Sequence, residues 1–187
     1  MMAASPTVRR KRLGIELRRL REQARLTCEE VGQRLDCSGT RIGRMETGRI
    51  SVRPGDAREL LEIYGVTGTE ADSLIQLARE ARRKGWWHTY GRVLPTWFEP
   101  YIGLESEAAA LRDFQCMVVP GLLQTKEYAR AVLRTAPMAG PAEDIDRQVA
   151  LRMDRQVTLG QQDPPDLWVV LSENVLRAQV EIGRAHV

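Results

Sequence analysis

The sequence predicts a mainly α-helical protein, with a five-helix N-terminal domain followed by a mixed α+β domain that we expect to be incomplete. Two observations predict this fold class. Over the first 84 residues, apolar side chains recur at helical spacing between helix-capping residues. Near residue 85 the composition changes to one rich in aromatic residues, glycine and proline. We therefore expect one domain over residues 8–84 and a second over residues 85–180.

The first predicted helix carries an apolar stripe. The stripe consists of Leu13, Leu17, Leu20 and Ala24. Steps of four, three and four residues place these side chains on one face of a helix, and the neighbouring charged residues fall largely elsewhere. The stripe is therefore the face by which this helix packs.

Two short helices joined by a tight turn follow. Thr27 and Glu30 have the spacing of a capping box, which predicts the start of the first of them. Asp36 occupies the turn, where aspartate tolerates a left-handed backbone better than most residues. Ser38 can cap the second helix, and Gly48 can end it in the left-handed conformation.

Two further helices complete the first domain. Pro54 with Asp56 predicts the start of the fourth helix, and Gly65 its end. Thr69 with Asp72 predicts the cap of the fifth.

The second domain mixes strands and helices. Residues 111–119 and 167–171 have strand-like composition. Helices are expected after Thr125 and after Pro141.

Charge is distributed unevenly along the chain. Residues 1–84 hold 18 Lys/Arg against 12 Asp/Glu, a net charge of +6, whereas the whole chain carries +3. The first domain is therefore the part suited to a polyanion such as double-stranded DNA.

Several classes of protein are not favoured. The longest apolar run, residues 116–123, is far shorter than the roughly 20 residues of a membrane span, so we expect no membrane partner and a cytoplasmic, nucleoid-associated protein. No cysteine or histidine spacing indicates a metal site, and no nucleophile with a base or phosphate loop indicates an enzyme. We expect no cofactor, metal or catalytic residue.

The segments "LRRLREQARLTCEEVGQRL" and "SGTRIGRMETG" carry a family resemblance. Residues 13–64 resemble the λ-repressor-like, xenobiotic-response-element (XRE) family of helix-turn-helix regulators. This resemblance implies that the second helix of the motif lies in the DNA major groove.

The resemblance implies a set of DNA-contacting residues. Thr40, Arg44 and Gly39 are expected on the base-reading face, since arginine can bind guanine bidentately and threonine can meet a thymine methyl group. The expected backbone contacts are Ser38, Arg41, Arg49, Thr27, Cys28, Arg9, Arg10 and Arg12. The last three belong to the basic run at 9–12, which could be a flexible arm, a phosphate clamp or a solubilising tail.

Three positions depart from the family pattern, and one of them is Asp36, which stands in the turn where relatives often have glycine. Cys28 stands where relatives usually have glutamine, and a thiol is a weaker donor to phosphate. Its place at a helix N-terminus near arginines would also favour the thiolate. Gly39 removes a side chain from the reading face, so moderate sequence specificity is expected.

The segments "GWW", "YIGLE", "VPGLLQT" and "YARA" carry a second resemblance. They resemble the domain of unknown function that follows the helix-turn-helix in many actinobacterial regulators, including the WhiJ type. Members are often encoded beside a small acidic partner protein, and some are described as antitoxin-like. The resemblance implies a sensing or partner-binding role.

An aromatic cluster begins the second domain. Trp86, Trp87, Tyr90 and Trp97 could line an effector pocket, or they could cement the junction between domains. Residues 181–187, "EIGRAHV", can be encoded by the start of a common sequencing adapter. We hypothesise that they are an assembly artefact and that the native second domain is longer.

The sequence thus predicts a dimeric, sequence-specific DNA-binding transcriptional regulator with a C-terminal sensing or partner-binding domain. The alternative is an antitoxin-like interaction protein that binds a small neighbouring-gene partner and autoregulates its operon.

Overall fold

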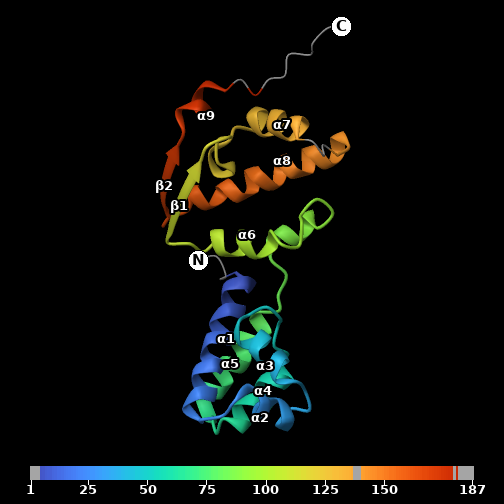
Figure 1. The fold of residues 1–187 in the computed structure, drawn as a ribbon, viewed down its shortest axis with the longest axis vertical. Coiled ribbons are helices and arrows are strands. Elements are labelled where there is room, and N and C mark those ends of the chain that lie inside the picture. The colour runs from blue at the N-terminus through green and yellow to red at the C-terminus, as the bar shows by residue number, and fades with distance from the viewer. Residues whose placement is uncertain (1–4, 137–139, 179, 181–187) are drawn as a thin grey trace. The chain divides into compact units, whose positions relative to one another are not determined.

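The computed structural model describes residues 5–136, 140–178 and 180 (Figure 1). The chain divides into two compact units, Met1–Gly85 and Trp86–Val187. No helix among the described residues is long and apolar enough to cross a bilayer. The hypothesised adapter segment, residues 181–187, lies outside the described residues.

The first unit is helical throughout its regular structure. Its helices are α1 (Pro6–Gln23), α2 (Cys28–Arg34), α3 (Gly39–Glu46), α4 (Pro54–Ile63) and α5 (Gly68–Glu80). The apolar stripe of α1 is buried, and it packs with side chains from the other four helices. The most deeply buried of these side chains are Leu13, Leu17, Val31, Ile42, Met45, Leu60 and Leu61. Burying each of them contributes about 1.5–3 kcal/mol, which holds the short helices α2 and α3 in place.

Most of the predicted helix ends are confirmed. Thr27 and Glu30 form the complete capping box, and the Ser38 hydroxyl accepts a hydrogen bond from the Arg41 amide at 3.3 Å. Asp36 adopts the left-handed conformation with φ 51°, and Gly48 does so with φ 68°. These local patterns were readable because each involves residues only a few positions apart.

Two expectations about helix starts are wrong. The fifth helix begins at Gly68, with Thr67 as its N-cap, so Thr69 and Asp72 do not cap it. The basic run at 9–12 is not a flexible arm, because α1 already begins at Pro6. Proline at the first helical position is preorganised for a helix, and the Ser5 hydroxyl caps it by accepting from the Thr7 amide.

The second unit contains α6 (Glu99–Glu105), β1 (Ala110–Gln115), α7 (Lys126–Thr135), α8 (Ala142–Gln156), β2 (Asp166–Leu171) and α9 (Glu173–Arg177). The two strands pair in parallel, from Ala110 opposite Asp166 to Gln115 opposite Leu171. A parallel pair needs a long crossover, and here it contains α7 and α8, which lie side by side (Figure 1). The mainly α fold class with a small mixed region is confirmed.

Candidate nucleic-acid interface

The turn between α2 and α3 brings the two helices very close together. The Cys37 amide donates to the Gly32 carbonyl at 2.8 Å. A Cβ atom on Gly32 would lie 2.6 Å from the Cys37 carbonyl oxygen, so any larger residue would force the turn away from α2. The geometry of a helix, a tight turn and a second helix therefore depends on a glycine inside α2.

The C-terminal end of α3 is held against α1. A Cβ on Gly14 would lie only 2.3 Å from the Glu46 carbonyl oxygen, so the backbones of α1 and α3 almost touch there. Gly48 also lies close to α1, since its Cβ would be 3.2 Å from the Lys11 Cα.

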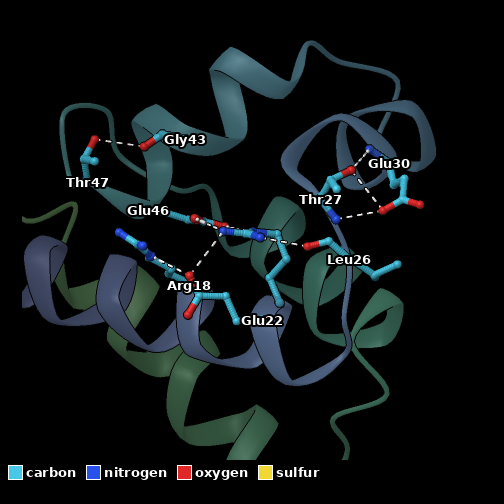
Figure 2. Close-up of polar contacts among 9 residues, drawn as sticks. Arg18, Glu22, Leu26, Thr27, Glu30, Gly43, Glu46 and Thr47 are labelled. Carbon is cyan, nitrogen blue, oxygen red and sulfur yellow. Dashed lines mark hydrogen bonds and ion pairs between the residues drawn. The ribbon is translucent and has the colours of Figure 1, made fainter.

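A buried ion pair completes this attachment. Arg21 donates from Nε and Nη2 to the two carboxylate oxygens of Glu46, at 2.6 and 2.9 Å. Its Nη1 donates to the Leu26 carbonyl at 2.7 Å, so the loop leading into α2 is held by the same guanidinium (Figure 2). Hydrogen bonding to Glu46 raises the pKa of Arg21 above its usual range. Sequence reasoning missed this pair because the partners lie 25 residues apart.

One face of α3 is open to solvent. Thr40 and Arg44 are both exposed, and Arg44 forms no ion pair with any described residue. Gly43 and Thr47 belong to the same face, because residues at i, i+3, i+4 and i+7 share one side of a helix. The Thr47 hydroxyl donates to the Gly43 carbonyl at 2.9 Å (Figure 2). Thr47 was not anticipated, although the helical spacing from Thr40 could have indicated it.

Gly39 has a different position from the one expected. A Cβ there would lie 2.9 Å from the Glu29 amide nitrogen and 3.0 Å from the Cys28 carbonyl carbon. Gly39 therefore packs against the first turn of α2 and does not belong to the open face of α3. It sets how closely the two helices approach.

Three predicted backbone contacts lie beside the open face. Ser38 and Arg49 are exposed, and Arg49 forms no ion pair with a described residue. Arg41 is already engaged, because its Nη2 donates to Asp56 Oδ2 at 2.7 Å. Asp56 lies in the first turn of α4, so this ion pair braces α3 against α4.

At the start of α2, Thr27 is exposed and its hydroxyl takes part in the capping box (Figure 2). Cys28 is half-buried against the core. Burial raises the pKa of the Cys28 thiol, and the nearby Glu46 carboxylate raises it further. The expectation that this position favours a thiolate is therefore wrong.

The basic residues of α1 are largely neutralised by carboxylates. Arg9 pairs with Glu80 at 3.2 Å, and Arg12 lines a shallow hollow together with three glutamates of α1 and α5. Arg10 has a buried Nε without a hydrogen-bond partner. Arg9 and Arg12 thus face α5 and not α3. The exposed Lys11, whose backbone lies against Gly48, is the basic residue of this run nearest the end of α3.

Other arginines of α1 are also paired. Arg18 donates to Glu22 at 2.8 Å (Figure 2). Arg19 donates to Glu16 at 2.8 Å. Around α3 and the loop after it, Arg44, Arg49 and Arg53 are exposed, so positive charge is available to a polyanion beside the open face.

The four aromatic residues at the start of the second unit differ in burial, and none of them lines the cavity described there. Trp87 is buried with Leu94, whereas Trp97 is 75% exposed. The Tyr90 hydroxyl donates to Asp154 at 2.5 Å, which raises the pKa of Tyr90 to about 12. The cavity described in this unit is lined by other residues, so a pocket of Trp86, Trp87, Tyr90 and Trp97 stays a prediction. Aromatic composition alone did not show which rings pack into the core.

Comparison with known families agrees with this geometry. Residues 12–74 match the model of a helix-turn-helix domain, and residues 98–186 match that of DUF5753, a domain of unknown function. The chain therefore contains a helix-turn-helix domain followed by a DUF5753 domain. The helix-turn-helix domain contains α2, α3 and their turn, and it points to a DNA-binding regulator. Searches of curated proteins and of solved structures found no match.

Proposed function

We propose that this protein is a sequence-specific transcriptional regulator of the λ-repressor-like XRE type that reads DNA with α3. The observation that carries the proposal is the open face of α3, where Thr40, Arg44 and Thr47 are exposed on a helix fixed at both ends. Gly32 and Gly14 set its distance from α2 and α1, and Arg21 holds its last turn. A rigid exposed helix of this length fits the major groove.

In this mechanism the two kinds of contact come from different residues. Arg44 donates bidentately to guanine, and Thr40 contacts a thymine methyl group. Ser38, Arg49 and Lys11 border that face and bind phosphates, which fixes the register of α3 without reading sequence.

The regulator acts as a dimer on a two-fold-related operator. One eight-residue helix contacts too few bases for tight and specific binding on its own. Two copies one helical turn apart on the DNA double the readable sequence.

The DUF5753 domain supplies sensing or partner binding. A partner role has a specific observation behind it, because the outer face of the sheet carries Phe114, 68% exposed, and Trp168, 63% exposed. Exposed apolar patches of this kind mark interaction sites. Arg112 belongs to the same face, which suits an acidic partner. The second candidate function is therefore an antitoxin-like protein that holds a small acidic neighbour and autoregulates its operon.

Arg44→Ala tests the leading proposal. The operator is first selected from random DNA, and affinities are then measured by fluorescence anisotropy. We expect a loss of about 1–3 kcal/mol on the selected site and a flattened preference at about one base pair. Arg58 is an exposed arginine of α4, and Arg58→Ala serves as the matched control. This variant should change neither the affinity for the selected site nor the base preference. Equal losses on selected and random DNA would contradict base reading by Arg44.

Co-expression with the neighbouring gene's product distinguishes the two candidate functions. The hypothesis of an antitoxin-like function requires a stable complex with this partner, and Trp168→Glu should disrupt that complex. A regulator without a bound partner would bind its operator alone and show no such complex.

A further inference from the structure

A cavity of about 430 Å³ lies within the second unit. Its walls come from α6, from β1 and β2, from α8 and from residues 118–124, the loop that leads to α7. Two sequence segments that carry the resemblance to the domain of unknown function, "YIGLE" at 101–105 and "VPGLLQT" at 119–125, thus meet around one space. The volume falls in the range of about 300–1,000 Å³ that small-molecule sites occupy.

Two arginines of α8, one helical turn apart, line this cavity. Arg155 is neutralised, because its Nε and Nη2 each donate to Glu105 at 2.7 Å. The side chains of this pair are only 9% and 2% exposed. The pair therefore forms a rigid polar wall that carries no net charge.

Arg152 has no such compensation. Its one hydrogen bond to a described residue runs from Nη1 to the neutral Gln124 side-chain oxygen, and it forms no ion pair with a described carboxylate. A guanidinium has five N–H donors, so the others lack protein acceptors. No nitrogen of Arg152 belongs to the buried side-chain atoms that lack a hydrogen-bond partner in the described part of the chain, so its unpaired N–H groups are accessible to solvent. Desolvation and the nearby Arg155 lower the pKa of Arg152, consistent with an uncompensated positive charge.

Another part of the lining, contributed by Phe98 and Tyr101, is aromatic and flat. The rings of Phe98 and Tyr101 stack at 5.1 Å with an interplanar angle of 12°. Arg155 lies over both rings, 5.1 Å from the Phe98 centroid. Leu111 and Leu122 also line the cavity. This surface suits the hydrocarbon or aromatic body of a ligand.

The loop that closes the cavity is fixed by hydrogen bonds. Gln124 donates to the Val119 carbonyl at 2.6 Å, and Gln156 donates to the Gln124 carbonyl at 2.7 Å. Gly121 leaves little room for a side chain, since a Cβ there would lie 3.2 Å from Arg155 Nη1. The site is therefore formed before any ligand arrives, which lowers the entropic cost of binding.

We propose that this cavity binds a small organic anion with an apolar or aromatic body, and that Arg152 is the charge partner of its acidic group. The anion would complete the hydrogen bonding of Arg152, while the stacked rings would pack against its body. The inference deepens the sensing part of the proposed function, but its test needs no DNA. Failure here would leave DNA reading by α3 untouched.

Three acids and two neutral counterparts test the proposal on the full chain. Benzoate, phenyl phosphate and hexanoate are titrated beside benzamide and hexanamide, and binding is followed by ¹⁵N NMR at the Gly121 and Gln124 amides. We expect at least one acid to bind about tenfold or more tightly than its neutral counterpart, because a charge-assisted hydrogen bond is worth at least about 1.4 kcal/mol. Equal affinities, or no shift of these amides with any acid, would overturn the proposal.

Variants then test whether Arg152 is the charge partner of the acidic group. Arg152→Gln should abolish the preference for the acid, and Arg152→Lys should retain part of it. Arg147→Gln, at an exposed position on the same helix, is the control and should bind like the wild type. If Arg152→Gln unfolds the unit, Leu111→Phe narrows the cavity without changing its charge and should weaken binding of acid and amide together. Unchanged acid binding in a folded Arg152→Gln would refute the assignment.

Discussion

The described residues of each unit include a buried arginine–glutamate pair, and the surroundings of the two pairs differ. Arg21 with Glu46 is 12% and 5% exposed, and Arg155 with Glu105 is 9% and 2% exposed. Both pairs are bidentate, and both join segments far apart in the chain. Arg21 also donates from Nη1 to the Leu26 backbone carbonyl beside a helical core. Arg155 instead lies over two aromatic rings beside a cavity.

The difference shows what the same local chemistry does in two settings. A buried pair seldom adds much net stability, but removing one partner is costly, so it fixes the segments that it joins. In the first unit the fixed object is the helix proposed to read DNA. In the second it is the wall of a cavity whose other arginine, Arg152, has no carboxylate partner.

Removing the first pair has the largest expected effect. Glu46→Ala leaves Arg21 as an unpaired charge in the core and should lower the free energy of unfolding of the first unit by about 3–5 kcal/mol. Urea denaturation followed by far-UV circular dichroism measures this loss. All four tryptophans lie in the second unit, so the midpoint followed by tryptophan fluorescence should not move.

A double variant checks the cause. Arg21→Met combined with Glu46→Leu replaces the pair by apolar side chains and should recover most of the lost stability. A double variant as unstable as Glu46→Ala would show that the pair itself was not responsible.

Weakening the pair of Arg155 and Glu105 should lower the free energy of unfolding by less than Glu46→Ala does. Glu105→Gln keeps one acceptor for Arg155, which also retains its contact with the rings and borders a solvent-accessible space. We expect a loss of about 1.5–3 kcal/mol, the worth of a hydrogen bond to a charged group. Here the tryptophan fluorescence midpoint should fall while the first unit's transition stays in place. A shift in both transitions would contradict the independence of the two pairs.

Matched helix caps give the smallest effect. Thr27 caps α2 in the first unit, and Thr125 caps α7 in the second. Changing either to alanine should cost about 1 kcal/mol. Circular dichroism should report the first loss and tryptophan fluorescence the second. If neither variant changed the free energy of unfolding, the two caps would not contribute to stability.

The sequence predicted the features whose causes are local. The capping box of Thr27 and Glu30, the left-handed Asp36 and the apolar stripe of α1 all depend on residues within a turn or two of one another. The exposure of Arg44 followed from helical spacing in the same way.

What the sequence could not predict depends on distant partners. The sequence predicted that Arg9 contacts the DNA backbone, but Arg9 forms an ion pair with Glu80. It also predicted Gly39 on the base-reading face of α3, but Gly39 packs against α2. The cavity around Arg152 needs five segments to meet. No single-sequence pattern reports such encounters, because they depend on tertiary packing.

The close crossings at Gly14, Gly32 and Gly39 carry a consequence for mutational tolerance. A methyl group at any of them would collide with backbone atoms, which cannot move aside as a flexible side chain can. Substitution at these positions should therefore be tolerated as poorly as substitution of a core leucine, although glycine contributes almost no apolar surface. A comprehensive substitution library would identify three intolerant sites that hydrophobicity alone would never reveal.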